Sequence, residues 1–367
     1  MFFILFFIMQ LLITCPYGLW SLLAHELKKL WFNPENTFQT WTFINTDMHG
    51  MMKINYWSRI ANKVFIQLCK DEARTFDQLF ELIKNSSYPQ YLSNTHVEIK
   101  VQTKASQLSS VRSVQSVAHK ALLESIKNFG DEAGRTTELL LTLENDSATL
   151  YLNSSGTALH QRGYRKQTGT APLKENLAVA LLLLAGWRFK SPLLDPFCGS
   201  GTLAIEAALL AKNIAPGSWR TFAFEKFKNF ENKSFQEIKA EAEQKIFDGK
   251  YQIFAYDHDP RMVSLAKSNA KAANVEDCIH FEQKDFLKSE FSLNEASRMI
   301  TNPPYGKRLK TQDLEELYLK LKKSFTGFLA GGRISSFPMQ DMKKEFRKEK
   351  KLFNGNEKCS FWQKKVN

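Results

Sequence analysis

A chain of 367 residues is long enough for two or three domains with their own hydrophobic cores. Its 43% hydrophobic content is ordinary for a soluble globular protein and argues against a mainly disordered chain. The 50 Lys and Arg residues outnumber the 38 Asp and Glu residues, and the net charge of +12 favours a polyanionic partner such as nucleic acid.

The first residues, 1–13, are almost wholly apolar. They lack the basic region and the small-residue cleavage site of a signal peptide, and Pro16 interrupts them before the roughly 20 apolar residues that a spanning helix needs. We favour a first buried strand over residues 9–15, with synthesis starting at Met9. Membrane insertion is the alternative, and we expect no stable membrane partner.

The rest of the first half mixes helical and strand patterns. Apolar residues at helical spacing indicate helices over residues 19–30, 56–69, 75–84 and 111–129. Alternation indicates a strand over residues 96–103, and two apolar runs, 139–143 and 148–152, indicate a hairpin. Residues 154–172, rich in Gly, Thr, Arg and Lys, are predicted to be a linker. Its basic part either contacts RNA or is a solvated connection.

Beyond this linker the pattern becomes strand, helix, strand, helix, which is typical of a doubly wound α/β sheet. The first strand ends at Asp195, a turn through Gly199 and Gly201 follows, and residues 203–210 are helical. The glycines let the backbone pass close to a ligand at the carboxyl edge of the sheet. This turn lacks the third glycine of a dinucleotide-binding fingerprint. It also lacks the Gly-Lys-Ser/Thr of a P-loop, which excludes that type of site.

The next two units place further polar groups at strand ends. Residues 251–256 form a predicted strand that ends at Asp257, before a helix over 260–273, and an acidic residue there suits a ribose diol. The following unit, 279–286, offers Asp285 as an acceptor for an adenine amine, with Phe286 packing beside the ring. A solvated loop aspartate is an equally good interpretation of Asp285.

Another apolar strand, over residues 299–301, ends in Asn302-Pro303-Pro304-Tyr305. Two consecutive prolines fix the backbone between an amide and an aromatic side chain. An exocyclic amine is hard to methylate because its lone pair is delocalised into the ring, so an enzyme must accept its hydrogen bonds. The Asn302 side-chain oxygen and the Pro303 carbonyl are suitable acceptors, and Tyr305 would stack on the base.

The five cysteines are odd in number and scattered, with no CxxC pair and no histidine at metal spacing. We expect reduced thiols, a cytoplasmic protein and no metal site. Cys198 lies in the glycine turn and is interpreted as a small residue that lines this turn, because no histidine stands near it to activate a nucleophile.

Two segments, 195–202 and 302–306, resemble the motifs of class I S-adenosylmethionine-dependent RNA methyltransferases that carry a THUMP domain. The most similar group is that of bacterial 23S ribosomal RNA guanine-N2 methyltransferases, whose segment before the catalytic domain resembles residues 159–165 and 171–176. The resemblance implies a Rossmann-like class I α/β methyltransferase domain with a seven-stranded sheet. It implies three parts: a ferredoxin-like unit over 1–65, an α+β THUMP RNA-binding domain over 66–155 and the methyltransferase domain over 156–367.

The resemblance also implies roles for individual residues. Asp195, Gly199 and Gly201 would line the methionine part of S-adenosylmethionine, Asp257 the ribose and Asp285 the adenine. Neighbouring residues would complete the cofactor site, namely Phe197, Cys198, Thr202 and Phe286. The target base would contact Asn302, Pro303, Pro304 and Tyr305.

The sequence therefore predicts methyl transfer to an exocyclic amine of RNA, with guanine N2 of 23S ribosomal RNA as the first choice and a single reaction expected. Alternatives are a transfer RNA guanine-N2 or an adenine-N6 methyltransferase, or a non-catalytic RNA-binding protein in ribosome assembly. Phosphate contacts are predicted for four basic residues, Arg112, Lys120, Arg162 and Arg165.

Overall fold

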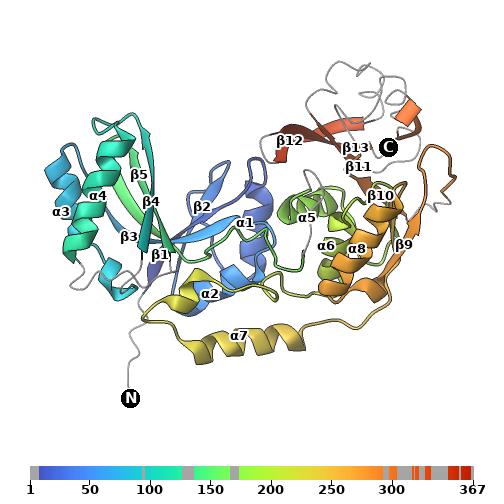
Figure 1. Cartoon of the computed structure of the whole chain (residues 1–367), viewed down its shortest axis with the longest axis horizontal. Helices are drawn as coiled ribbons and strands as arrows, with labels where there is room; N and C mark the ends of the chain where they lie inside the picture. The colour runs from blue at the N-terminus through green and yellow to red at the C-terminus, as the bar shows by residue number, and fades with distance from the viewer. Residues whose placement is uncertain are drawn as a thin grey trace.

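The computed structural model describes residues 8–92, 96–125, 136–165, 173–291, 297–303, 316–317, 319–321, 327–331, 346–354 and 357–364. Two mixed α/β units lie side by side, each built around one sheet (Figure 1). The N-terminal unit holds β1 to β6 and the C-terminal unit holds β7 to β13.

The N-terminal sheet has six strands in the order β2-β1-β3-β6-β5-β4. The strands are β1 (Met9–Thr14), β2 (Trp41–Thr46), β3 (Lys63–Glu72), β4 (His96–Lys104), β5 (Thr136–Glu144) and β6 (Ser147–Asn153). The helices are α1 (Trp20–Lys29), α2 (Met48–Trp57), α3 (Phe76–Lys84) and α4 (Val111–Ser125). Thr75 closes a capping box with Gln78 at the start of α3, and α3 and α4 pack against each other beside β4 (Figure 1).

Most elements predicted in this half are confirmed, and one is wrong. Strand β1 lies in the interior of the sheet between β2 and β3, and β5 and β6 form the predicted hairpin. The helix predicted over 56–69 is instead the end of α2, a buried turn and the start of β3. Val64, Phe65 and Ile66 are all buried, so both faces of β3 are apolar and the run lacks the alternation that marks a strand.

The seven-stranded sheet predicted for the C-terminal unit is confirmed, with the order β12-β13-β11-β10-β7-β8-β9. The neighbouring strands β11, β10, β7, β8 and β9 are all parallel. Strand β13 lies between β11 and β12 and is antiparallel to both. The strands are β7 (Leu193–Asp195), β8 (Ile253–Asp257), β9 (Ile279–Gln283), β10 (Arg298–Thr301), β11 (Gly327–Gly331), β12 (Phe346–Asn354) and β13 (Glu357–Lys364). The helices are α5 (Glu175–Leu184), α6 (Thr202–Ala211), α7 (Asn232–Gln244) and α8 (Pro260–Ala272).

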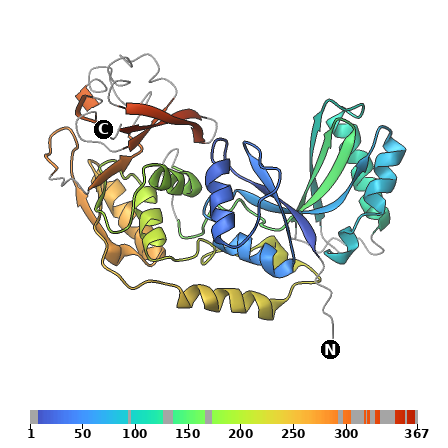
Figure 2. The same ribbon diagram turned by 180° about the vertical axis from the view of Figure 1, so that it is seen from behind.

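Helix α7 follows α6 in the chain but reaches the N-terminal unit. It packs on α2, where the His49 ring nitrogen Nδ1 and the Ser234 hydroxyl lie 2.9 Å apart. In the view from behind, α7 (yellow) runs along the lower edge of the molecule, beneath the two units (Figure 2). The chain therefore crosses between the units more than once.

The linker predicted over residues 154–172 is wrong for its described part, 154–165. Ser154 and Ser155 are fully buried, and the Ser154 hydroxyl donates to the Val64 carbonyl at 2.8 Å. Residues 166–172 lie outside the described residues. Ser154 and Ser155, at the start of this segment, therefore form buried hydrogen bonds rather than facing solvent.

No helix among the described residues is long and apolar enough to cross a bilayer. Residues 1–7 lie outside the described part of the chain. None of the five cysteines forms a disulfide, and four of the five are buried. Within the described residues, no group of three or more His, Cys, Asp and Glu side chains is placed to hold a metal ion.

Candidate active site

The turn between β7 and α6 has the backbone that the sequence predicted. Gly199 and Gly201 have φ values of +52° and +82°, in the left-handed region that glycine adopts without strain. The buried Asn269 amide, from α8, donates to the Ser200 carbonyl at 3.1 Å and fixes the middle of the turn. An ideal Cβ on Gly199 would meet nothing within 4 Å, so the backbone there faces open space.

Asp195 lies at the carboxyl end of β7 with 2% of its surface exposed. The Thr301 hydroxyl donates to it at 2.5 Å, and the Phe197 amide donates at 3.3 Å. Burial disfavours the charged form and raises the pKa of Asp195 to about 7, with a smaller contribution from the nearby charge of Asp257. This carboxyl group changes its charge near neutral pH.

The Thr301–Asp195 hydrogen bond brings the two motifs together. Strands β7 and β10 are parallel neighbours, so both end at the same edge of the sheet. Asn302 follows Thr301 directly, and its Oδ1 atom is buried without a hydrogen-bond partner among the described residues. Pro303 is buried, whereas Pro304 and Tyr305 lie outside the described residues. A buried acceptor with no partner is costly unless a ligand supplies the donor.

Asp257 ends β8, the neighbour of β7 on the other side. Its carboxylate accepts hydrogen bonds from the Gly199 amide at 2.9 Å and from the Asp259 amide at 3.0 Å. The Cys198 amide donates to the Tyr256 carbonyl at 2.8 Å. Burial raises the pKa of the Cys198 thiol well above its usual value, which keeps the thiol protonated.

Asp285 and Phe286 follow β9 on the same side of the sheet. The Asp285 side chain is 40% exposed and accepts from the Leu287 amide at 2.9 Å. Phe286 is 2% exposed, and its ring centre lies 5.1 Å from that of Phe197. The structure thus brings all the predicted cofactor residues to three adjacent strand ends, while their contacts with a cofactor stay predictions.

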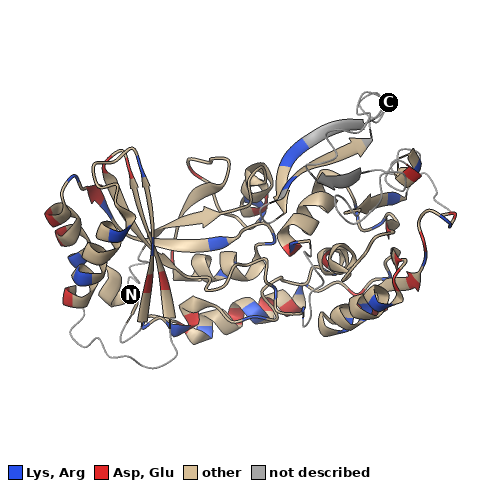
Figure 3. Cartoon of the chain, turned by 45° about the horizontal axis from the view of Figure 1, so that its top comes forward, with Lys and Arg blue, Asp and Glu red and all other residues tan. Residues whose placement is uncertain are grey.

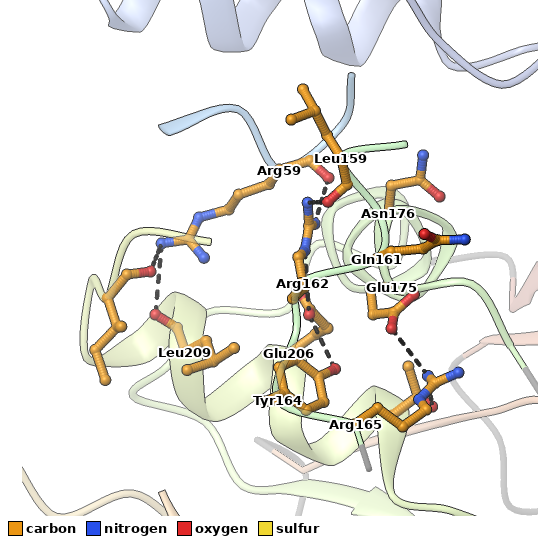
Figure 4. Close-up of polar contacts among 12 residues, drawn as sticks. Arg59, Leu159, Gln161, Arg162, Tyr164, Arg165, Glu175, Asn176, Glu206 and Leu209 are labelled. Carbon is orange, nitrogen blue, oxygen red and sulfur yellow. Dashed lines mark hydrogen bonds and ion pairs between the residues drawn. The ribbon is translucent and has the colours of Figure 1, made fainter. Parts of the chain in front are cut away.

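The four predicted RNA-binding residues fall into two pairs. Arg112 and Lys120 are exposed on α4. Arg162 is 1% exposed and its guanidinium donates to the carbonyls of Leu159 and Arg59, so its predicted phosphate contact is wrong (Figure 4). The Arg165 side chain is 9% exposed, and its guanidinium donates to the Thr202 hydroxyl at 2.6 Å. Its predicted phosphate contact is therefore also wrong.

Sequence reasoning missed several residues that shape this site. Thr301 holds Asp195, Asn269 holds the turn, and Glu206, in the middle of α6, accepts from the Tyr164 hydroxyl at 3.1 Å. A glutamate within the otherwise apolar run 203–211 was an available signal, since a fully buried carboxylate requires a polar partner.

Gly201 tests the packing of the turn. An ideal Cβ on Gly201 would lie 2.9 Å from the Ala266 Cβ, in addition to the cost of a positive φ. We expect Gly201→Ala to lower the free energy of unfolding by about 3 kcal/mol, against about 1 kcal/mol for Gly199→Ala, where the space is open. Chemical denaturation of the two variants checks this, and equal losses would contradict it.

Comparison with known proteins gives two family matches. Residues 162–361 match the family described as "RMKL-like, methyltransferase domain", and residues 10–65 match the RlmL ferredoxin-like domain. The chain is 34% identical to the Bacillus subtilis protein "Putative RNA methyltransferase YpsC", over 96% of this chain and 95% of that protein. It is 32% identical to the ribosomal RNA large subunit methyltransferase K/L of a Shewanella species, and it spans 52% of the length of that relative.

Solved structures show the same architecture over nearly the whole chain. SMU.472, described as "a putative methyltransferase complexed with SAH", has a TM-score of 0.86 and 28% identity, with 98% of this chain and 99% of that chain covered. A "predicted N6-adenine-specific DNA methylase" from Listeria monocytogenes has a TM-score of 0.86 and 30% identity, with 96% of each chain covered. SAH is S-adenosylhomocysteine, the product left after a methyl group has been transferred from S-adenosylmethionine.

Proposed function

Because this chain belongs to the family of RMKL-like methyltransferase domains, we propose that it transfers a methyl group from S-adenosylmethionine to guanine N2 of 23S ribosomal RNA. The hydrogen bond between Thr301 and Asp195 carries the proposal, because it joins the glycine turn to the corner at Asn302. A methyl donor and an amine acceptor have to meet at one such place.

The cofactor side of the site fits S-adenosylmethionine. The backbone at Gly199 faces open space, and the carboxylates at the ends of three adjacent strands are acceptors for the cofactor's ammonium, ribose and adenine groups. Asp195, Gly199 and Gly201 would hold the methionine part, Asp257 the ribose and Asp285 the adenine. The bound cofactor supplies an electrophilic methyl group, so the protein need not form a covalent intermediate.

The target side of the site fits an exocyclic amine. The buried Asn302 Oδ1 would accept one N–H, and the Pro303 carbonyl would accept the other. The base leaves its stack to reach these groups, at a cost of a few kcal/mol that hydrogen bonds and stacking offset. Stacking on Tyr305 and the role of Pro304 are part of the same proposal.

The rest of the chain would hold the RNA. Arg112 and Lys120 are exposed on α4 and would contact phosphates. Basic side chains are spread over both units among acidic ones, so we expect a broad contact rather than a single basic stripe (Figure 3). The ferredoxin-like unit at 1–65, the THUMP domain at 66–155 and the methyltransferase domain at 156–367 remain proposed boundaries, and the enzyme is proposed to be cytoplasmic.

Nucleoside analysis tests the target. Ribosomal and transfer RNA from cells that lack the protein are digested and examined by mass spectrometry, and 23S RNA is expected to lose one N2-methylguanosine. Purified protein with S-adenosylmethionine should restore it. Loss of N6-methyladenosine instead would favour methylation of adenine N6, the reaction suggested by the name of the Listeria structure. Loss of N2-methylguanosine from transfer RNA would identify transfer RNA as the substrate. No loss from any RNA would contradict the proposal.

The raised pKa of Asp195 predicts how cofactor binding depends on pH. The pKa of about 7 means that this carboxyl group is mostly protonated at lower pH and ionised above it. Because the ionised form attracts the cofactor's ammonium group, affinity should rise about tenfold from about pH 6 to about pH 8 and then level off. Asp195→Asn should bind weakly with a flat pH profile. Calorimetry checks both, and a wild-type affinity that falls over this range would contradict the assignment.

A further inference from the structure

Three arginines contact one face of α6, the helix that begins at the glycine turn (Figure 4). Positions three or four residues apart in a helix are neighbours on one face. The contacts are Arg165 with the Thr202 hydroxyl, Arg162 with the Glu206 carboxylate, and Arg59 with the Leu209 carbonyl. The face is thus held near its start, at its middle and near its end.

Arg59 comes from the N-terminal unit, in the turn between α2 and β3. Its guanidinium donates to the carbonyl of Ile214 at 2.8 Å and to that of Leu209 at 3.5 Å. Leu209 is in the last turn of α6, its carbonyl also accepts from the Ile214 amide at 2.9 Å, and a cation is favourable at this end of a helix. The backbone of Arg59 is itself held by the carboxylate of Glu26, which accepts from its amide at 2.8 Å.

Arg162 connects Arg59 to Glu206, in the middle of α6. It donates to the Arg59 carbonyl at 2.7 Å and pairs with Glu206 at 3.5 Å, and both charged side chains are buried. A buried ion pair adds little net stability over apolar packing, because desolvation opposes the attraction. Its effect is therefore expected on geometry, as a fixed spacing between α6 and the N-terminal unit.

Arg165 contacts the turn most directly. One of its nitrogens donates to the Thr202 hydroxyl at 2.6 Å and to the Leu173 carbonyl at 3.2 Å. The same guanidinium lies 3.4 Å from the carboxylate of Glu175, and burial raises the pKa of this carboxyl group. Thr202 immediately follows Gly201, and its hydroxyl lies 3.4 Å from that of Ser200.

We propose that Arg165 is a positioning residue for S-adenosylmethionine, acting through Thr202 and supported by Arg162 and Arg59. By holding the first residue of α6, it fixes the backbone of the turn that binds the cofactor. Through Arg59, the N-terminal unit contributes to cofactor affinity as well as to RNA contact. The inference rests on the proposed function, because it assumes that this turn binds the cofactor.

A double-mutant cycle on the full chain tests the inference, with the dissociation constant for S-adenosylhomocysteine measured by calorimetry. Arg165→Met and Thr202→Val should each weaken binding about tenfold. The double variant should bind no more weakly than the single variants, because both substitutions remove the same contact. Thr202→Ser keeps the hydroxyl that Arg165 contacts and should bind more tightly than Thr202→Val. In Arg165→Met, KM for RNA should not change.

Exposed Arg188, in the same unit, provides the matched control, and Arg188→Ala should not alter binding. An Arg165→Met affinity within about twofold of the wild type, or losses that add in the double variant, would overturn the inference. If Arg165→Met does not fold, Arg165→Lys carries the same expectation, because a lysine keeps the charge beside Glu175 but lacks the planar fork. A wild-type protein that does not bind S-adenosylhomocysteine would instead contradict the proposed function.

Discussion

Asn302→Ala is expected to slow methyl transfer by about 100-fold to 1000-fold, the effect of removing one preorganised hydrogen-bonding group from an active site. The Asn302 Oδ1 atom is buried with no partner among the described residues, so it is available for the target amine. Alanine has no acceptor at this place. The rate is measured under single-turnover conditions, as methyl label passing from S-adenosylmethionine to 23S RNA that lacks the modification.

Two further measurements separate this role from a structural one. The Asn302→Ala variant should bind S-adenosylhomocysteine as the wild type does, because Asn302 belongs to the target side of the site. Asn302→Asp keeps an acceptor oxygen and should be faster than Asn302→Ala. An alanine variant with the wild-type rate, or one whose only defect is in cofactor binding, would remove Asn302 from the proposed mechanism.

The second large effect is on stability. Arg162→Met is expected to lower the free energy of unfolding by about 3–5 kcal/mol, the cost of leaving a buried charge without its partner. Glu206 would remain fully buried, with the Tyr164 hydroxyl as its neighbour on Oε1. Guanidinium chloride unfolding, followed by tryptophan fluorescence, measures the loss.

The matched control removes both charges together. Arg162→Met combined with Glu206→Leu should recover most of the lost stability, because no buried carboxylate then lacks a cation. Methionine and leucine also suit the apolar surroundings of α6 in size. A single Arg162→Met variant as stable as the wild type would show that water or relaxation compensates for the pair.

Local patterns predicted much of the fold. The start of α3 follows from the Thr75 cap, and the strand–turn–helix units of the second half follow from apolar runs that end at Asp195 and Asp257. Strand β3 was mistaken for a helix, because a strand buried on both faces carries no alternation. Helix α5 and helix α7 were not predicted. Helix α5 is buried nearly all round and so lacks an amphipathic pattern. Helix α7 buries Phe235, Ile238 and Ala242 at helical spacing, a signal that was present in the sequence.

The sequence predicted the main residues of the candidate site, but not the residues that hold them in place. Asp195 and Asn302 stand at strand ends, and the ends of parallel strands meet at one edge of a sheet. The hydrogen bond from Thr301 to Asp195 depends on β7 and β10 being neighbours, which a single sequence does not state. Arg162 was predicted to contact phosphate, because composition does not distinguish a buried arginine from an exposed one.

Helix α7 belongs in sequence to the C-terminal unit and rests on α2 of the N-terminal one. The Arg59 guanidinium joins the same two units at a second place, through the Ile214 carbonyl. On the proposed function, these two junctions would set the distance from an RNA-binding surface on the N-terminal unit to the reacting nitrogen. The nucleotide that is methylated would then be selected first by its distance from the RNA contacts along the folded RNA. Contacts with the base itself would act only at the active site.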